Sequence, residues 1–195
     1  MKKIKFVIIG CGRIGNRHAE HISEQGELVA VCDINEEKAK SLSEKYESKY
    51  FTNINELSSS NLEYDVVSIC TPNGLHCEHS IFFLNQKKHV LCEKPLALSS
   101  EDCGKMIVAA ENNNVRLFAV KQNRFNPPVV KVKELIENNK LGDICTVQLN
   151  CFWNRNFDYY HDSWKGTIKM DGGTLFTQFS HFIDYLPVSS KCSTF

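Results

Sequence analysis

The chain has 195 residues and carries 23 Lys and Arg against 23 Asp and Glu, so its formal net charge is zero. Scattered, balanced charges do not favour nucleic acid as a partner, because its binding proteins usually present a basic patch. The length suits one full domain and part of a second. No signal-peptide h-region follows Met1, and no apolar run could span a bilayer, so we expect a cytoplasmic protein that does not bind membranes.

Residues 4–33 have the pattern of a strand, a glycine turn, a helix and a second strand that ends on an acid. The strand 4–9 leads into the turn 10–15, and the second strand covers 28–33. A βαβ unit that binds a dinucleotide requires this spacing. The alternative is a doubly wound domain whose glycine turn binds nothing.

The glycines of this turn have separate roles. Gly10 allows the tight turn, Gly12 lets the backbone approach a pyrophosphate, and Gly15 lets the helix pack close to the strand. The pyrophosphate would lie at the helix N-terminus. The carboxylate of Asp33 can accept hydrogen bonds from a ribose diol and would repel a 2′-phosphate, so the sequence predicts NAD as the cofactor.

Further strands alternate with helices as far as residue 121. Strands are predicted at 50–52, 66–70, 89–92 and 116–121, and helices at 36–42, 53–57, 75–85 and from Ser99 or Ser100 onward, with Asn35 as an N-cap. This alternation predicts an α/β fold, in which a doubly wound parallel Rossmann sheet occupies residues 1–121.

The pattern changes after residue 121, and we expect an incomplete α+β substrate domain over 122–195. It is predicted to hold a loop at 122–128, a helix at 129–138, a strand at 144–153, an aromatic loop at 154–164 and a helix at 174–186.

Cysteine and histidine spacing argues against disulfides and metal. The nine cysteines are odd in number and form no Cys-x-x-Cys pair, so we expect reduced, structural thiols. His76 and His79 could be taken for metal ligands, but no cysteine or acid partner stands at ligand spacing from them, so no metal is expected. The nine are Cys11, Cys32, Cys70, Cys77, Cys92, Cys103, Cys145, Cys151 and Cys192.

Polar groups follow three predicted strands, at 71–73, 93–95 and 122–124. Ligands of doubly wound sheets bind at the carboxyl ends of the strands. Lys94, held by the following proline, could donate to a substrate hydroxyl or to its developing carbonyl oxygen. An ordinary exposed lysine is the alternative.

Thr177, His181 and Asp184 are spaced to share one face of the last predicted helix. His181 could take a proton from a sugar hydroxyl as hydride leaves for NAD. Because the same helix carries several phenylalanines, a satisfied core histidine is the alternative.

Over residues 1 to about 186 the chain resembles the glucose–fructose oxidoreductase / inositol dehydrogenase / MocA family. The resemblance implies NAD(P)-dependent oxidation or reduction of a sugar or polyol carbon, with Lys94 and His181 as catalytic residues. It rests on Gly10-x-Gly12-x-x-Gly15, Asp33, Thr71-Pro72-Asn73, Glu93-Lys94-Pro95, Asn123-Arg124-Phe125, and Gly172-Gly173-x-Leu175 through His181-x-x-Asp184.

Thr177 stands where many members of the family carry an aspartate. This threonine and the segments 153–156 and 164–167 resemble a narrower subgroup, the dehydrogenases that oxidise the 3-hydroxyl of UDP-N-acetylglucosaminuronic acid in bacterial surface-polysaccharide (lipopolysaccharide) synthesis. A dehydrogenase of a free sugar or inositol, or a non-catalytic dinucleotide-binding protein, are the alternatives.

The resemblance also implies the site residues and a homo-oligomer for full-length members. The expected cofactor contacts are Gly10, Gly12, Arg13, Ile14, Gly15, Asp33, Thr71, Pro72, Asn73, His76, Glu93, Lys94, Gln122 and Trp164. The expected contacts of a nucleotide-sugar substrate are Lys94, Asn123, Arg124, Tyr159, Thr177, Gln178 and His181.

The segment 187–195 resembles nothing in the family, so we expect a C-terminally truncated member. Without the rest of the family's C-terminal sheet, aromatic side chains of the second domain should be partly exposed. These are Phe152, Phe176, Phe179 and Phe182.

Overall fold

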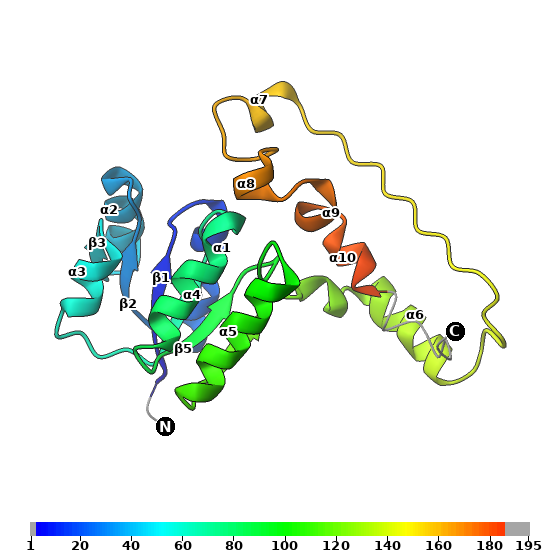
Figure 1. The fold of residues 1–195 in the computed structure, drawn as a ribbon, viewed down its shortest axis with the longest axis horizontal. Coiled ribbons are helices and arrows are strands. Elements are labelled where there is room, and N and C mark those ends of the chain that lie inside the picture. The colour runs from blue at the N-terminus through cyan, green and yellow to red at the C-terminus, as the bar shows by residue number, and fades with distance from the viewer. Residues whose placement is uncertain (1–2, 186–195) are drawn as a thin grey trace. The chain divides into compact units, whose positions relative to one another are not determined.

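A computed structural model describes residues 3–185 of the chain. The chain divides into two compact units, Met1–Val120 and Lys121–Phe195, which are drawn in Figure 1. The expected binding residues are distributed between both units, and each unit is described here by itself.

The N-terminal unit is built on a six-stranded sheet in the order β3-β2-β1-β4-β5-β6, and all pairs are parallel. This is the order of a doubly wound Rossmann sheet, and the predicted fold is confirmed. The chain reverses direction across the sheet between β1 and β4, which places the switch point beside the glycine turn. The strands are β1 Lys5–Ile9, β2 Glu27–Cys32, β3 Lys49–Phe51, β4 Val66–Ile69, β5 His89–Cys92 and β6 Leu117–Ala119.

Helices alternate with these strands, and side chains cap three of them. Asn35 Oδ1 accepts from the backbone N–H of Lys38 at 3.0 Å, and Ser99 Oγ accepts from that of Asp102 at 3.0 Å. Asn53 caps a third helix in the same way. The helices are α1 Arg13–Gln25, α2 Glu36–Lys45, α3 Ile54–Ser59, α4 His76–Leu84 and α5 Ser100–Asn112, and the 3₁₀ turn η1 covers Asn73–Leu75.

Two apolar cores cover the two faces of the sheet. Ile8 of β1 packs with α1 and α2, where Ala19 and Leu42 are buried. Its neighbour Val7 packs in the other core, with Phe83 of α4 and Met106 of α5. Successive strand residues point to opposite faces, so α1 and α4 cover opposite faces of the sheet.

The described part of the C-terminal unit has short helical segments as its only regular secondary structure, and Ile136 is its single buried apolar residue. Phe152 is 96% exposed, and Phe176, Phe179 and Phe182 are each partly exposed. The exposure that the sequence predicted for these four aromatic side chains is confirmed. The helical segments are η2 Gln122–Phe125, α6 Pro127–Glu137, α7 Phe157–Tyr160, α8 Ile168–Asp171, α9 Thr174–Thr177 and α10 Ser180–Ile183.

Two predicted elements of this unit were wrong. Residues 144–153 form no strand, and Figure 1 shows them within a long yellow trace. A strand needs hydrogen-bonded neighbours, and the described part of this unit contains no second strand. The helix predicted at 174–186 is two short helices, α9 and α10, interrupted where Gln178 leaves regular helical geometry at φ −110°. Residue 186 and the segment 187–195 lie outside the described residues.

The eight cysteines within residues 3–185 are all free. Over the same residues, no helix is long and apolar enough to cross a bilayer. No cluster of three or more His, Cys, Asp or Glu side chains in that range could hold a metal ion.

Candidate functional site

The turn after β1 requires glycine at two positions. Gly10 adopts a φ of +97°, and its N–H donates to Cys32 O at 2.8 Å. A Cβ at Gly15 would lie 2.0 Å from the carbonyl oxygen of Gly10, where no side chain fits. The close packing that the sequence predicted at Gly15 is therefore present.

Gly12 leaves open space at the N-terminus of α1. A Cβ at Gly12 would meet nothing within 4 Å, no side chain caps the helix, and its first turn contains no acidic residue. The free backbone N–H groups and the helix dipole favour an anion at this position. Arg13, the first helical residue, is exposed and adds positive charge, while Ile14 is half-buried. These features fit the pyrophosphate of a dinucleotide.

Asp33 follows β2 and its carboxylate has a fixed orientation. Oδ2 accepts from the backbone N–H of Cys11 at 2.7 Å, and Oδ1 accepts from that of Asn35 at 2.8 Å. The carboxylate therefore lies between the glycine turn and the start of α2. It is half-buried and remains accessible to a ribose hydroxyl.

His76 is the first residue of α4, shortly after the strand-end segment 71–73, and is 1% exposed. Its Nδ1 lies 2.7 Å from Pro95 O and its Nε2 lies 2.9 Å from Thr71 O. The ring thereby joins the ends of β4 and β5, a connection that the sequence did not predict. The neighbouring Pro72 is half-buried and Asn73 is buried.

Glu93 and Lys94 follow β5. Both oxygens of the buried Glu93 are used: Oε1 lies 3.0 Å from His18 Nε2, and Oε2 accepts from the Lys94 N–H at 3.0 Å. Burial raises the pKa of Glu93, but the hydrogen bonds from His18 and from the Lys94 N–H outweigh it, so the pKa lies below its ordinary value. The side chain is therefore an anion at neutral pH.

Sequence reasoning missed His18. Its Nδ1 lies 2.6 Å from the hydroxyl of Ser68, which is fully buried on β4. No spacing rule pointed to this contact, because His18 and Glu93 are 75 residues apart.

Arg124 and Asp184 form a bidentate ion pair in the C-terminal unit. Arg124 Nε donates to Asp184 Oδ2 at 2.6 Å, and the second hydrogen bond, to Oδ1, is 2.7 Å long. Hydrogen bonding from Arg124 holds the pKa of Asp184 below its usual value, and Lys121 adds to this effect from 3.7 Å. The guanidinium expected to contact substrate is thus held by a carboxylate.

His181 is 6% exposed in α10. Thr177 belongs to α9, and its hydroxyl donates to Gly173 O at 3.0 Å. Because a turn at 178–179 separates the two helices, Thr177, His181 and Asp184 do not belong to the one continuous helix that the sequence predicted.

The remaining predicted residues of this unit are distributed along it. The ring of Tyr159 lies 4.1 Å from Lys165 Nζ, a cation–π contact. Gln178 Nε2 donates to the hydroxyl of Tyr160 at 3.5 Å. Trp164 and Asn123 are half-buried, and Gln122 is exposed at the start of η2.

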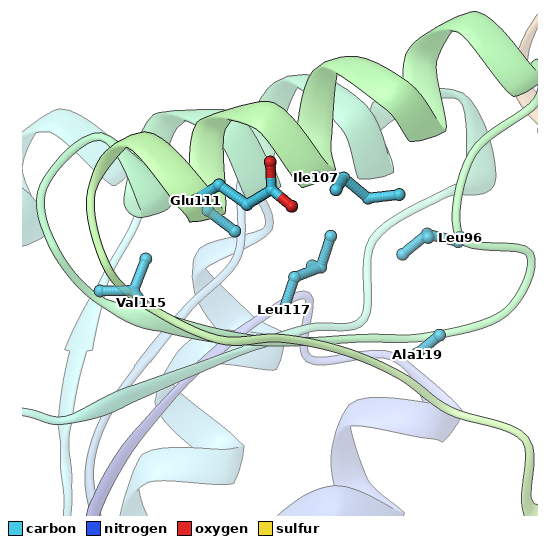
Figure 2. Close-up of a pocket in the computed structure, with 7 residues that line it drawn as sticks. Leu96, Ile107, Glu111, Val115, Leu117 and Ala119 are labelled. Carbon is cyan, nitrogen blue, oxygen red and sulfur yellow. The ribbon is translucent and has the colours of Figure 1, made fainter.

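A hollow between α5 and β6 is separate from these residues (Figure 2). Its lining is apolar apart from Glu111, and it contains none of the predicted site residues. The strand ends and the glycine turn therefore remain the candidate site of the N-terminal unit.

We expect the N-terminal unit to lose stability as the pH falls. Burial lowers the pKa values of His76 and His79, so the unfolded chain takes up protons below about pH 6.5 that the folded chain does not. The lowered pKa of Glu93 extends this loss into more acidic solution. Urea unfolding at pH 7.5, 6.5 and 5.5 measures the effect, and a constant free energy of unfolding over that range would contradict it.

An open parallel sheet with this strand order, an uncapped glycine turn and an acid after the second strand defines a dinucleotide-binding protein. A family model described as "Oxidoreductase family, NAD-binding Rossmann fold" matches residues 4–121, and one for the "GFO/IDH/MocA C-terminal domain" matches residues 129–188. The chain belongs to the Gfo/Idh/MocA oxidoreductase family, and its N-terminal unit is an NAD-binding Rossmann domain.

Curated relatives and solved structures agree with this assignment. Glucose-6-phosphate 3-dehydrogenase of Bacillus subtilis is 35% identical over 188 residues, which are 94% of this chain and 52% of that protein. The scyllo-inositol 2-dehydrogenase (NADP(+)) of B. subtilis is 34% identical over 169 residues, 85% of this chain and 50% of that protein. The structure of the WlbA dehydrogenase of Bordetella pertussis with NADH and UDP-GlcNAcA is 36% identical, with a TM-score of 0.90, over 95% of this chain and 54% of that one. The chain thus spans about half the length of these relatives.

Proposed function

We propose that the chain acts in the NAD-dependent oxidation of a sugar hydroxyl, the 3-hydroxyl of a UDP-linked N-acetylhexosaminuronic acid. The observation that carries this proposal is the similarity, along 95% of the chain, to a dehydrogenase crystallised with NADH and UDP-GlcNAcA. A relative named as a 3-dehydrogenase, of glucose 6-phosphate, supports the position of oxidation. Surface-polysaccharide synthesis is the process in which such a product would be used.

In this proposal the N-terminal unit holds the cofactor. The N–H groups at the start of α1 bind the pyrophosphate, and Asp33 accepts hydrogen bonds from the adenosine ribose. Bound NAD⁺ supplies the hydride acceptor. The segments that follow β4 and β5, with Thr71 and Lys94, would hold the nicotinamide end of the cofactor.

Lys94 and His181 are the proposed catalytic residues. The Lys94 ammonium donates a hydrogen bond to the reacting hydroxyl oxygen and stabilises the charge that develops there. The His181 imidazole accepts the hydroxyl proton as the carbonyl forms. Arg124, Tyr159 and Gln178 are proposed to contact the sugar or its phosphates.

A second candidate function is dinucleotide binding without catalysis. It is favoured by the scarcity of buried apolar residues in the C-terminal unit, where Ile136 alone is buried among the described ones. A unit of this kind lacks the packing that holds catalytic groups in place.

Incubation of the chain with NAD⁺ and a panel of sugars separates the candidates. The panel contains UDP-GlcNAcA, UDP-GlcNAc, glucose 6-phosphate and myo-inositol, and NADH absorbance reports oxidation. NADH formation with UDP-GlcNAcA alone supports the proposed substrate. Formation only with another sugar overturns the substrate, and cofactor binding without turnover of any sugar favours the second candidate.

The affinity for NAD⁺ should fall about tenfold to a hundredfold on Asp33→Ala, because hydrogen bonds to a charged group contribute about 1.5–3 kcal/mol. The affinity for NADP⁺ should fall less, since the repulsion of a 2′-phosphate is removed. Quenching of protein fluorescence by each cofactor measures both dissociation constants, and Glu37→Ala on the exposed side of α2 serves as the control. Equal affinities for the two cofactors in the unmodified chain would refute the assignment.

A further inference from the structure

The side chain of Glu93 holds the backbone of Lys94. The N–H of Lys94 donates to Glu93 Oε2 at 3.0 Å, and Glu93 is 8% exposed. A buried carboxylate is costly unless its oxygens are paired. The position of the Lys94 backbone therefore depends on what fixes the other oxygen of Glu93.

His18 is the group that fixes it. His18 Nε2 lies 3.0 Å from Glu93 Oε1, and the two side chains are 12% and 10% exposed. An ionised carboxylate only accepts hydrogen bonds, so Nε2 carries a proton and donates it. The Ser68 hydroxyl, 2.6 Å from Nδ1, fixes the ring from the opposite edge and can accept or donate as required.

The connection joins two functional parts of the N-terminal unit. His18 belongs to α1, whose N-terminus is the open anion site at Gly12. Glu93 and Lys94 follow β5, which is separated from β1 by β4 in the sheet. On the opposite face, His76 of α4 contacts the carbonyl of Pro95, the residue after Lys94.

We propose that His18 is a positioning residue for Lys94: through Glu93, it fixes the backbone of Lys94 relative to the helix that carries the cofactor turn. The importance of this for turnover rests on the proposed role of Lys94. The positioning itself is a property of the folded N-terminal unit and can be measured without a sugar.

Two substitutions of His18 distinguish the ring nitrogen that contacts Glu93 from the one that contacts Ser68. The side-chain amide of Gln in His18→Gln can reach the place of Nε2 and keep a donor to Glu93. The shorter Asn in His18→Asn can replace only Nδ1, the nitrogen beside Ser68. His21→Asn is the matched control, because His21 is exposed on the same helix.

The backbone amide of Lys94 reports the outcome in a ¹H–¹⁵N NMR spectrum of the full ¹⁵N-labelled chain. We expect His18→Asn to move the Lys94 amide proton upfield and to accelerate its exchange with solvent by about tenfold, the equivalent of one hydrogen bond. His18→Gln should retain the position and protection of this amide, and His21→Asn should leave both unchanged.

An unchanged Lys94 amide in a folded His18→Asn protein would overturn the proposal, as would equal changes in the Gln and Asn variants. Ser68→Ala gives a second test if His18→Asn does not fold. It removes the contact that orients the ring, and we expect the same upfield displacement with a smaller amplitude, whereas no displacement would again count against positioning. Absence of sugar oxidation with these amide shifts intact would refute the proposed function and leave the role of His18 standing.

Discussion

Lys94→Ala and His181→Ala should each lower the turnover number for the sugar by about a hundredfold to ten-thousandfold, the usual contribution of a general acid–base group. Removing the ammonium leaves the developing charge on the substrate oxygen without its donor, and removing the imidazole leaves the hydroxyl proton without an acceptor. The affinity for NAD⁺ should remain nearly unchanged, because the proposed contacts with pyrophosphate and ribose are elsewhere. Initial rates of NADH formation, with cofactor dissociation constants measured separately, test both expectations.

Exposed residues of the same types provide the controls for these substitutions. Lys40→Ala on α2 and His161→Ala after α7 remove the same groups from exposed positions. Both controls should retain full rates. Near-normal turnover in Lys94→Ala or His181→Ala would show that the catalytic assignment is wrong.

The second large effect is expected at the glycine turn, where two substitutions should act in different ways. Gly15→Ala places a Cβ 2.0 Å from Gly10 O, so we expect it to destabilise the N-terminal unit by about 3 kcal/mol or more. Gly12→Ala meets no protein atom within 4 Å and keeps its backbone angles, so the unit should fold normally. Its methyl group would occupy the space proposed for the pyrophosphate, and NAD⁺ affinity should fall by about tenfold to a hundredfold.

Urea unfolding and cofactor titration together distinguish the two effects. Gly104→Ala is the matched control, because this glycine lies inside α5 with nothing within 4 Å of an added Cβ. We expect it to stabilise the chain by about 0.5–1 kcal/mol without altering NAD⁺ binding. Unaltered NAD⁺ affinity in a folded Gly12→Ala protein would place the pyrophosphate elsewhere.

The N-terminal unit could be predicted because its signals are local. The glycine turn, Asp33 and the Asn35 cap each follow from a few neighbouring residues, and alternating strands and helices then leave few possible sheet orders. The contact between His18 and Glu93 could not be predicted, because it depends on where α1 lies against the sheet, which lets the His18 side chain reach Ser68 of β4 and Glu93 after β5.

The C-terminal unit was harder to predict for the same reason. The apolar alternation over 144–153 predicts a strand, but a strand forms only with a partner, and the described residues of this unit provide none. The run 174–186 has helical spacing, yet a turn at 178–179 interrupts it, so Thr177 belongs to α9 and His181 to α10. Asp184 then pairs with Arg124, 60 residues earlier, which no periodicity could indicate.

The uneven distribution of buried apolar residues between the two units has a calorimetric consequence. The heat-capacity increment of unfolding and the denaturant m-value both grow with the apolar surface that unfolding exposes. Nearly all of the buried apolar residues among 3–185 belong to the N-terminal unit, and Ile136 is the exception. A melting curve of this chain therefore reports the Rossmann domain, with an enthalpy and heat capacity expected for about 120 residues rather than 195.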